Sequence, residues 1–128
     1  MNRKSPSRQG VSLQAWYGIR SFAERAIAES PLGGLDVLSL RLLDWIYATQ
    51  SSKEPLYVQT IITKSQVASP ATLHKCLAAL LGEELIQAEI DPVDSRRKII
   101  SATPKLNQAM LELNQKTKRW LEEQSKMS

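Results

Sequence analysis

The first half of the chain shows helical spacing of apolar residues. Over residues 12–29 they recur every three or four positions, which predicts a helix with one buried face. Its apolar positions are Leu13, Trp16, Tyr17, Ile19, Phe22, Ala23 and Ile27. Ser12 is a favourable N-cap, and Pro31 together with Gly33 and Gly34 ends the helix.

A second helical segment, 35–48, is apolar on almost every side. Its few polar positions are Asp36, Ser39, Arg41 and Asp44. A helix of this kind is covered on more than one side, so we expect it to be the central helix. The polar loop 50–55 follows, and Leu56 with Tyr57 could add a very short strand.

Two short helices come next and predict a helix-turn-helix. Apolar spacing from Val58 to Ile62 gives one helix that ends near Ser65. Ser69 and Pro70 start the second, because serine caps free amides and proline loses no hydrogen bond at the first helical position. The apolar face of this second helix consists of Leu73, Leu77, Leu80 and Leu81. Its other faces carry Ala71, Thr72, His74, Lys75 and Ala78.

After Gly82 the apolar period changes from helical to alternating. This predicts two short strands, 85–90 and 99–102, joined by the loop 91–97. A helix-turn-helix followed directly by a β-hairpin is a winged helix, and the loop is then the tip of the wing.

A long final helix begins with the same signal, a hydroxyl residue followed by proline, at Thr103 and Pro104. Its apolar series is Leu106, Met110, Leu113, Trp120 and Leu121, with Thr117 in register. Alternating steps of four and three are typical of a helix–helix seam, so we expect it to pack on the first helix of the same chain or of a second one. We assign the dimerisation surface to Leu13, Trp16, Leu106, Met110, Leu113, Trp120 and Leu121.

The predicted fold is mainly α with a small β-hairpin: a winged helix-turn-helix with N- and C-terminal dimerisation helices. A chain of 128 residues is long enough for one domain with a proper core. We expect a flexible basic tail over 1–11 and a single domain over 12–128. The winged lobe then covers about 35–103, and the dimerisation helices about 12–29 and 104–124.

Charge, hydropathy and the numbers of cysteine and histidine limit the classes of function that the chain can have. The formal net charge of +4 is a modest preference for polyanions. No apolar run could cross a bilayer or form the core of a signal peptide, so we expect a cytoplasmic protein. One cysteine, Cys76, and one histidine, His74, give no internal disulfide and no ligand set for zinc, and we expect neither a metal nor a cofactor.

An enzyme is disfavoured because no serine lies in a nucleophile-elbow pattern and neither His74 nor Cys76 has a catalytic partner at motif spacing. Two alternatives stay open. Cys76 is either packed or a redox-sensing thiol. Trp16, Tyr17 and Tyr47 are either core residues or the lining of a ligand pocket.

In a winged helix, the second helix of the helix-turn-helix enters the major groove, and a wing arginine can reach into the minor groove. Asp94 could hold Arg96 in position by a charge-assisted hydrogen bond. The predicted DNA-binding residues are Ser69, Ala71, Thr72, His74, Lys75, Asp94, Arg96, Arg97 and Lys98.

This order of elements resembles the MarR family of bacterial transcription regulators over roughly residues 12–124. The resemblance is carried by Asp94, Ser95, Arg96 and Thr103 in the wing and by Ser69, Thr72 and Lys75 in the preceding helix. It implies a homodimer, built from the terminal helices, that binds a pseudo-palindromic operator in double-stranded DNA. It also implies release by a small-molecule effector bound between the dimer helices and the DNA-binding lobes.

Three positions depart from the family pattern. The glycine usual before the wing strands is Glu84 here, with Gly82 two residues earlier, so we expect this turn to be built differently. Ala102 stands where the family has leucine, and Leu106 where it has glycine.

The sequence therefore favours a dimeric DNA-binding transcription regulator, most simply a repressor. The alternative is a winged helix used for protein–protein assembly without DNA binding. Between Lys64 and Lys105, five acids nearly balance six basic residues and keep this alternative open. The acids are Glu83, Glu84, Glu89, Asp91 and Asp94.

Overall fold

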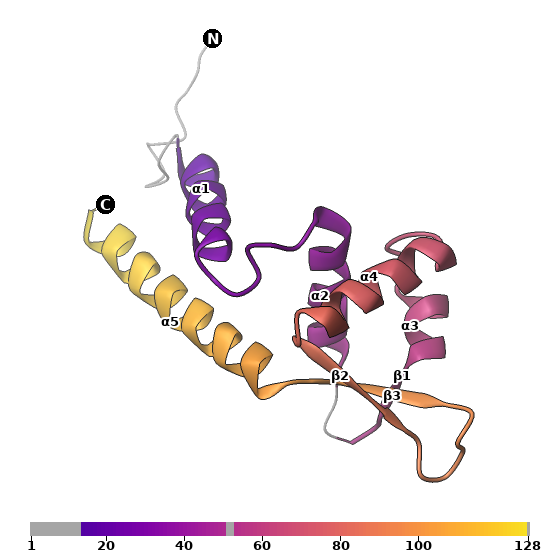
Figure 1. The fold of residues 1–128 in the computed structure, drawn as a ribbon. Helices are drawn as coiled ribbons and strands as arrows, with labels where there is room; N and C mark the ends of the chain where they lie inside the picture. The colour runs from indigo at the N-terminus through magenta and orange to yellow at the C-terminus, as the bar shows by residue number, and fades with distance from the viewer. Residues whose placement is uncertain (1–13, 51–52, 128) are drawn as a thin grey trace. The chain divides into compact units, whose positions relative to one another are not determined.

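The computed structural model describes residues 14–50 and 53–127, and over this part of the chain it contains five helices and a three-stranded antiparallel sheet (Figure 1). The predicted mainly α winged-helix fold is confirmed. Two compact units divide the chain: Met1–Gly33 with Ala109–Ser128, and Gly34–Gln108. Across the described residues, no helix combines the length and apolar character that a membrane span requires.

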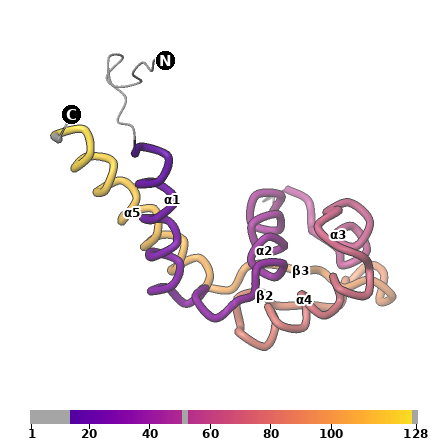
Figure 2. The backbone as a smooth tube through the Cα atoms, turned by 90° about the horizontal axis from the view of Figure 1, so that it is seen from above, coloured from indigo at the N-terminus to yellow at the C-terminus, as the bar shows by residue number. Residues whose placement is uncertain are grey.

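The first unit contains α1 (Ala15–Ala28) and most of α5 (Pro104–Met127), which lie side by side (Figure 2). Phe22 stacks on Trp120, with ring centroids 5.1 Å apart and an interplanar angle of 21°. Such a pair adds specific geometry to the burial of two large apolar surfaces. The last helix therefore packs on the first helix of its own chain, one of the two partners that its seam allowed. The predicted cap Ser12 lies outside the described residues.

The turn after α1 depends on Gly33. The Gly33 amide donates to the Ser30 carbonyl at 3.0 Å, which draws the chain back over the end of the helix. A Cβ on Gly33 would lie 2.4 Å from the Ala28 carbonyl oxygen, whereas a Cβ on Gly34 would meet nothing within 4 Å.

We therefore expect Gly33→Ala to lower the free energy of unfolding by about 1–3 kcal/mol, because backbone must move to admit the methyl group. Gly34→Ala is the matched control and should leave stability nearly unchanged. Thermal or urea unfolding of both variants measures the difference. Equal stability of the two variants would show that the turn accommodates a side chain.

The second unit contains α2 (Val37–Thr49), β1 (Leu56–Tyr57), α3 (Val58–Lys64), α4 (Pro70–Gly82), β2 (Ile86–Ile90) and β3 (Lys98–Ala102). The strands lie in the order β1-β3-β2, with Leu56 opposite Ile100 and Ile86 opposite Ala102. The short strand expected at Leu56 and Tyr57 is confirmed. It adds an edge to the wing hairpin and leads directly into α3.

The core of this unit joins α2 to the helix-turn-helix and the sheet. Its fully buried side chains include Leu42, Leu43, Ile46, Ile61, Leu73, Leu80, Leu85, Ile86 and Leu106. Asp36 caps α2 by accepting the Ser39 amide at 2.8 Å. The cover of α2 is incomplete, because Val37 at its start is exposed.

One prediction for α4 was wrong. Leu81, placed on the apolar face from the sequence, is exposed, and Cys76 is buried instead. The buried positions of α4 are Leu73, Cys76, Leu77 and Leu80. They follow the i, i+3, i+4, i+7 spacing of one narrow face, and Leu81 lies at its edge.

The turn between α4 and β2 passes through Glu84, whose φ of 60° is the left-handed conformation that glycine adopts without cost. The Leu85 amide donates to the Leu80 carbonyl at 3.1 Å and closes the end of α4.

Exchanging the glycine position should stabilise the protein. Glu84→Gly removes the left-handed strain and is expected to add about 0.5–1 kcal/mol. Gly82→Ala, in the last turn of α4 where a Cβ meets nothing within 4 Å, should add a similar amount, roughly 0.5–1 kcal/mol. Glu84→Gln is the control for the lost charge and should add nothing. Urea unfolding measures the stability of all three variants. A gain in Glu84→Gln equal to that in Glu84→Gly would show that the loss of charge causes the effect.

Candidate nucleic-acid interface

Helix α4 presents a capped and exposed N-terminus. Ser69 is its N-cap and accepts the Thr72 amide at 3.4 Å, and the Ser69 hydroxyl donates to Thr72 Oγ1 at 3.2 Å. Pro70 follows at the first helical position, as the sequence indicated. The turn before this helix contains Gln66 in a left-handed conformation, with φ 54°.

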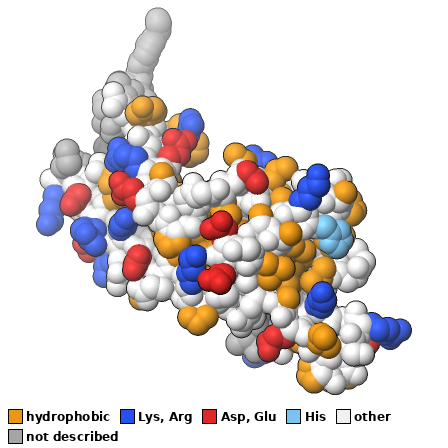
Figure 3. All heavy atoms as spheres, viewed as in Figure 1, with side chains coloured by type: hydrophobic (Ala, Val, Ile, Leu, Met, Phe, Trp, Pro, Cys, Tyr) orange, Lys and Arg blue, Asp and Glu red, His pale blue; other side chains and the backbone are white. Residues whose placement is uncertain are grey.

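The predicted DNA-binding residues of α4 come together on one exposed surface. Ser69, Ala71, His74 and Lys75 are exposed, and Thr72 is half-buried. Figure 3 shows one face of the molecule, on which blue basic side chains are scattered among hydrophobic and uncharged ones. Free amides at a helix start and basic side chains beside them are the groups that bind phosphate.

The wing loop is closed by its own backbone and by two aspartates. The Asp91 amide donates to the Arg97 carbonyl at 3.0 Å, and the Arg97 amide donates to the Asp94 carbonyl at 3.0 Å. Asp91 accepts the Val93 amide at 2.9 Å, and Asp94 accepts the Arg96 amide at 3.0 Å. Each carboxylate thus shapes a local turn and also meets an arginine side chain.

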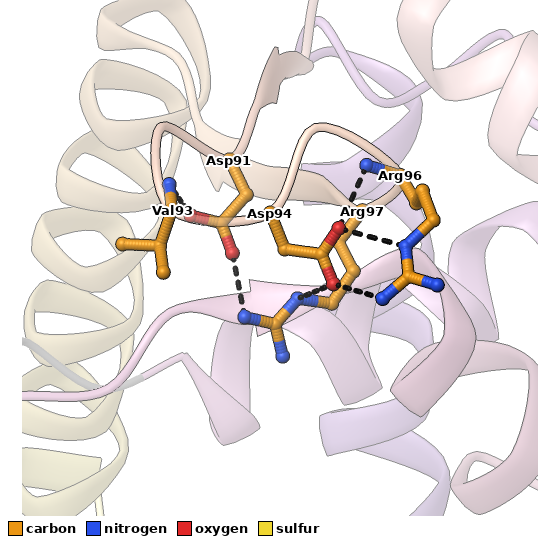
Figure 4. Close-up of polar contacts among 5 residues, drawn as sticks. All are labelled: Asp91, Val93, Asp94, Arg96 and Arg97. Carbon is orange, nitrogen blue, oxygen red and sulfur yellow. Dashed lines mark hydrogen bonds and ion pairs between the residues drawn. The ribbon is translucent and has the colours of Figure 1, made fainter.

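Asp94 holds Arg96 by two parallel contacts (Figure 4). Arg96 Nε donates to Asp94 Oδ1 and Nη2 to Oδ2, each at 3.0 Å, so the predicted charge-assisted hydrogen bond is confirmed. The Arg96 side chain is 88% exposed and that of Asp94 27%. The hydrogen bond from Arg96 lowers the pKa of Asp94, and the same bond raises the pKa of Arg96. Both groups are therefore charged at neutral pH, and the guanidinium is held at the exposed tip.

Arg97 is placed differently from its neighbour. Its Nη2 lies 2.9 Å from Asp91 Oδ2, and its Nε lies 3.8 Å from Asp94 Oδ2. The guanidinium carbon lies 4.3 Å from the centre of the Tyr57 ring in β1. A hydrogen bond from the Val93 amide and then the Arg97 charge lower the pKa of Asp91. Arg97 thus faces the protein, although the sequence suggested that both arginines reach outward.

The roles of Asp91 and Tyr57 are not predicted by the sequence. Asp91 reads there as one of the acids that balance the basic residues, yet its side chain is 5% exposed and pairs with Arg97. One signal was present, because Asp91 and Arg97 flank the hairpin loop and can therefore face each other. The contact with Tyr57 had no sequence signal, since it depends on β1 pairing with β3.

Comparisons with known proteins rest on structure. No protein-family model and no curated protein match the chain. RV1404 from Mycobacterium tuberculosis superposes with a TM-score of 0.73 at 16% identity, over 100% of this chain and 84% of that one. The S. aureus MepR–DNA complex gives 0.61 at 18% identity, over 88% of each chain. MarR gives 0.54 at 21% identity, over 86% of this chain and 78% of MarR.

The chain has the MarR-like winged-helix fold. Its terminal helices carry the residues predicted to form a dimer. Trp16 and Leu121 are 71% and 52% exposed, and Met110, Leu113 and Trp120 are half-buried. Leu106 is fully buried within its own chain, so we assign it to the core rather than to an interface. Leu13 lies outside the described residues.

Two hollows border the helix-turn-helix of this MarR-like lobe. One, of about 400 Å³, lies between the start of α2 and α4 and is lined by Asp36, Val37, Leu38, Ser39, Thr72, Lys75 and Cys76. The other, of about 210 Å³, is lined by Tyr57, Val58, Gln59, Arg96, Arg97 and Lys98. Cys76 is buried, which favours its packed role. Trp16 and Tyr17 are exposed, so neither is a core residue of the single chain.

Proposed function

We propose that the chain is a DNA-binding transcription regulator that acts as a homodimer, most simply a repressor, on a pseudo-palindromic operator. Recognition helices in two half-sites would read the major groove, and Arg96 would enter the neighbouring minor groove. The observation that carries the proposal is the Asp94–Arg96 pair, which orients an exposed guanidinium at the wing tip. A bidentate pair with a carboxylate fixes the geometry of the guanidinium that it holds.

The positions of the acids favour DNA over a protein partner. Asp91 and Asp94 are engaged by Arg97 and Arg96, so they do not present free negative charge at the wing. Of the five acids between Lys64 and Lys105, three remain outside these pairs and are exposed: Glu83, Glu84 and Glu89. Glu83 and Glu84 lie at the C-terminal end of α4, whereas Ser69, His74 and Lys75 belong to its first two turns. The glutamates therefore lie away from the first two turns of α4, where Lys75 is exposed and a phosphate could be met.

Selection from a random DNA pool tests the proposal. The purified protein should enrich an inverted repeat with half-sites about one helical turn apart, and sizing should show two chains on each duplex. Affinity for the enriched sequence should fall by several powers of ten over a modest rise in salt if about eight phosphates are contacted. No enrichment, together with capture of a protein partner by the wing, would instead support the protein-assembly alternative.

A further inference from the structure

We propose that Arg97 is a positioning residue that fixes the wing to β1, while its neighbour Arg96 meets the DNA. The inference rests on the proposed DNA-binding function and concerns how the wing is held for it. Figure 4 shows the Arg97 guanidinium between Asp91 and Asp94, and Arg96 on the other side of Asp94. Two adjacent residues of the same type thus have different partners.

The contacts of Arg97 tie three segments together. Asp91 and Arg97 lie at opposite ends of the wing loop. Arg97 Nη2 lies 2.9 Å from Asp91 Oδ2, and the backbones of the same two residues are also joined by a hydrogen bond. The Tyr57 ring, 4.3 Å from the guanidinium carbon, belongs to β1. Since α3 starts at the next residue, Val58, the contact connects the wing to the beginning of the helix-turn-helix.

Burial separates the two arginines further. The Arg97 side chain is 44% exposed and its partner Asp91 5%. A carboxylate with so little contact to water is costly without its cation, so Arg97 cannot leave Asp91 for a phosphate without a penalty. Arg96 is twice as exposed, and its partner Asp94 retains access to water. Arg96 can therefore exchange its partner, whereas Arg97 is held.

The two roles predict opposite effects of removing the Asp91 charge. If Arg97 contacted DNA, Asp91 would compete with the phosphates, and its neutralisation would strengthen binding. Loss of a negative charge close to DNA also favours binding on electrostatic grounds alone. If Arg97 positions the wing, neutralising Asp91 weakens binding despite the more favourable charge.

The experiment compares Asp91→Asn, Arg97→Met and the double variant, with Glu89→Gln as control. Asparagine keeps the oxygen that accepts the Val93 amide, so Asp91→Asn removes the charge and replaces the oxygen that faces Arg97 with an amide group. Glu89 is exposed, lies two residues away on β2, and undergoes the same change of charge. Dissociation constants are measured on the DNA sequence enriched by the parent, after circular dichroism has shown that each variant is folded.

We expect Asp91→Asn and Arg97→Met each to weaken binding about tenfold, as for a loop that must be ordered on the DNA. The double variant should bind DNA no more weakly than the weaker-binding single variant, because both substitutions break the same Asp91–Arg97 contact. Glu89→Gln should bind as well as the parent or better. Tighter binding by Asp91→Asn, or additive losses in the double variant, would overturn the positioning role.

Arg97→Lys provides a second discrimination. Lysine keeps the charge that a phosphate contact needs, but it lacks the planar group that reaches two carboxylates and lies over a ring at once. We expect Arg97→Lys to bind nearly as weakly as Arg97→Met. Binding at the level of the parent would mean that charge alone matters and would contradict the proposal.

A measurement without DNA separates this inference from the proposed function. Hydrogen exchange of the Asp91 and Arg97 amides, which close the wing loop, should be faster in Arg97→Met than in the parent and little changed in Glu89→Gln. If the parent selects no DNA but this faster exchange is seen, the proposed function is wrong and the positioning role of Arg97 is supported. Unchanged exchange in Arg97→Met would overturn the positioning role of Arg97 even where DNA binding is established.

Discussion

Arg96→Ala is expected to weaken binding to the selected DNA by about a hundredfold, since each of the two chains loses one directed contact. The substitution removes an exposed guanidinium and leaves the Asp94 carboxylate with only the longer contact to Arg97, 3.8 Å away. A less fully neutralised negative charge there repels the phosphate backbone, which adds to the loss. The effect should be larger where the minor groove under the wing is A·T-rich, because a narrow groove attracts arginine most strongly. Titrations on A·T- and G·C-substituted versions of the site measure this.

Arg119→Ala is the matched control. Arg119 is exposed on α5, in the unit that contains α1, and loses the same charge. We expect it to bind within about threefold of the parent, and Arg96→Ala to reduce the salt dependence by about two counterions per dimer. Binding by Arg96→Ala at the level of the parent would remove the wing from the mechanism and leave recognition to α4.

The order of helices and strands could be predicted from the sequence because each step has a local cause. Ser69 with Pro70 and Thr103 with Pro104 start two helices, and Thr103 Oγ1 does accept the Leu106 amide at 3.2 Å. The prediction was wrong at Leu81, whose exposure depends on how α4 packs against the rest of the lobe. Glu84 takes a conformation that favours glycine, because closure of the end of α4 requires it whatever residue is present.

The candidate site shows the same division. The Asp94–Arg96 pair was predictable, since both residues belong to one turn and two positions separate them. The placement of Arg97 was not, because it depends on the pairing of Tyr57 with Ile99, which brings β1 against the wing. Sequence spacing identifies contacts within a turn, but only the sheet register distinguishes which of two adjacent arginines faces the protein.

The exposed apolar side chains of the terminal helices predict a large effect on dimerisation. Trp16 and Leu121 remain exposed in the single chain even though α1 and α5 already pack on each other through Phe22 and Trp120. Large exposed apolar side chains on paired helices are typical of an interface. We therefore expect the double variant Trp16→Glu, Leu121→Glu to sediment as one chain at concentrations where the parent sediments as two. Its binding to the full inverted repeat should weaken at least about a hundredfold, because the second half-site no longer binds within the same complex.

Helix propensity does not explain such a loss. Trp16 lies in the first turn of α1, where an acid is favourable, and glutamate is a good helix former within α5. Circular dichroism should therefore show unchanged helix content. Asn114→Glu with Gln115→Glu adds the same two charges at exposed polar positions of α5 and should leave the dimer intact. If the Trp16 and Leu121 variant stayed dimeric, the two chains would have to meet through another surface, and the exposed apolar residues of these helices would need a different partner.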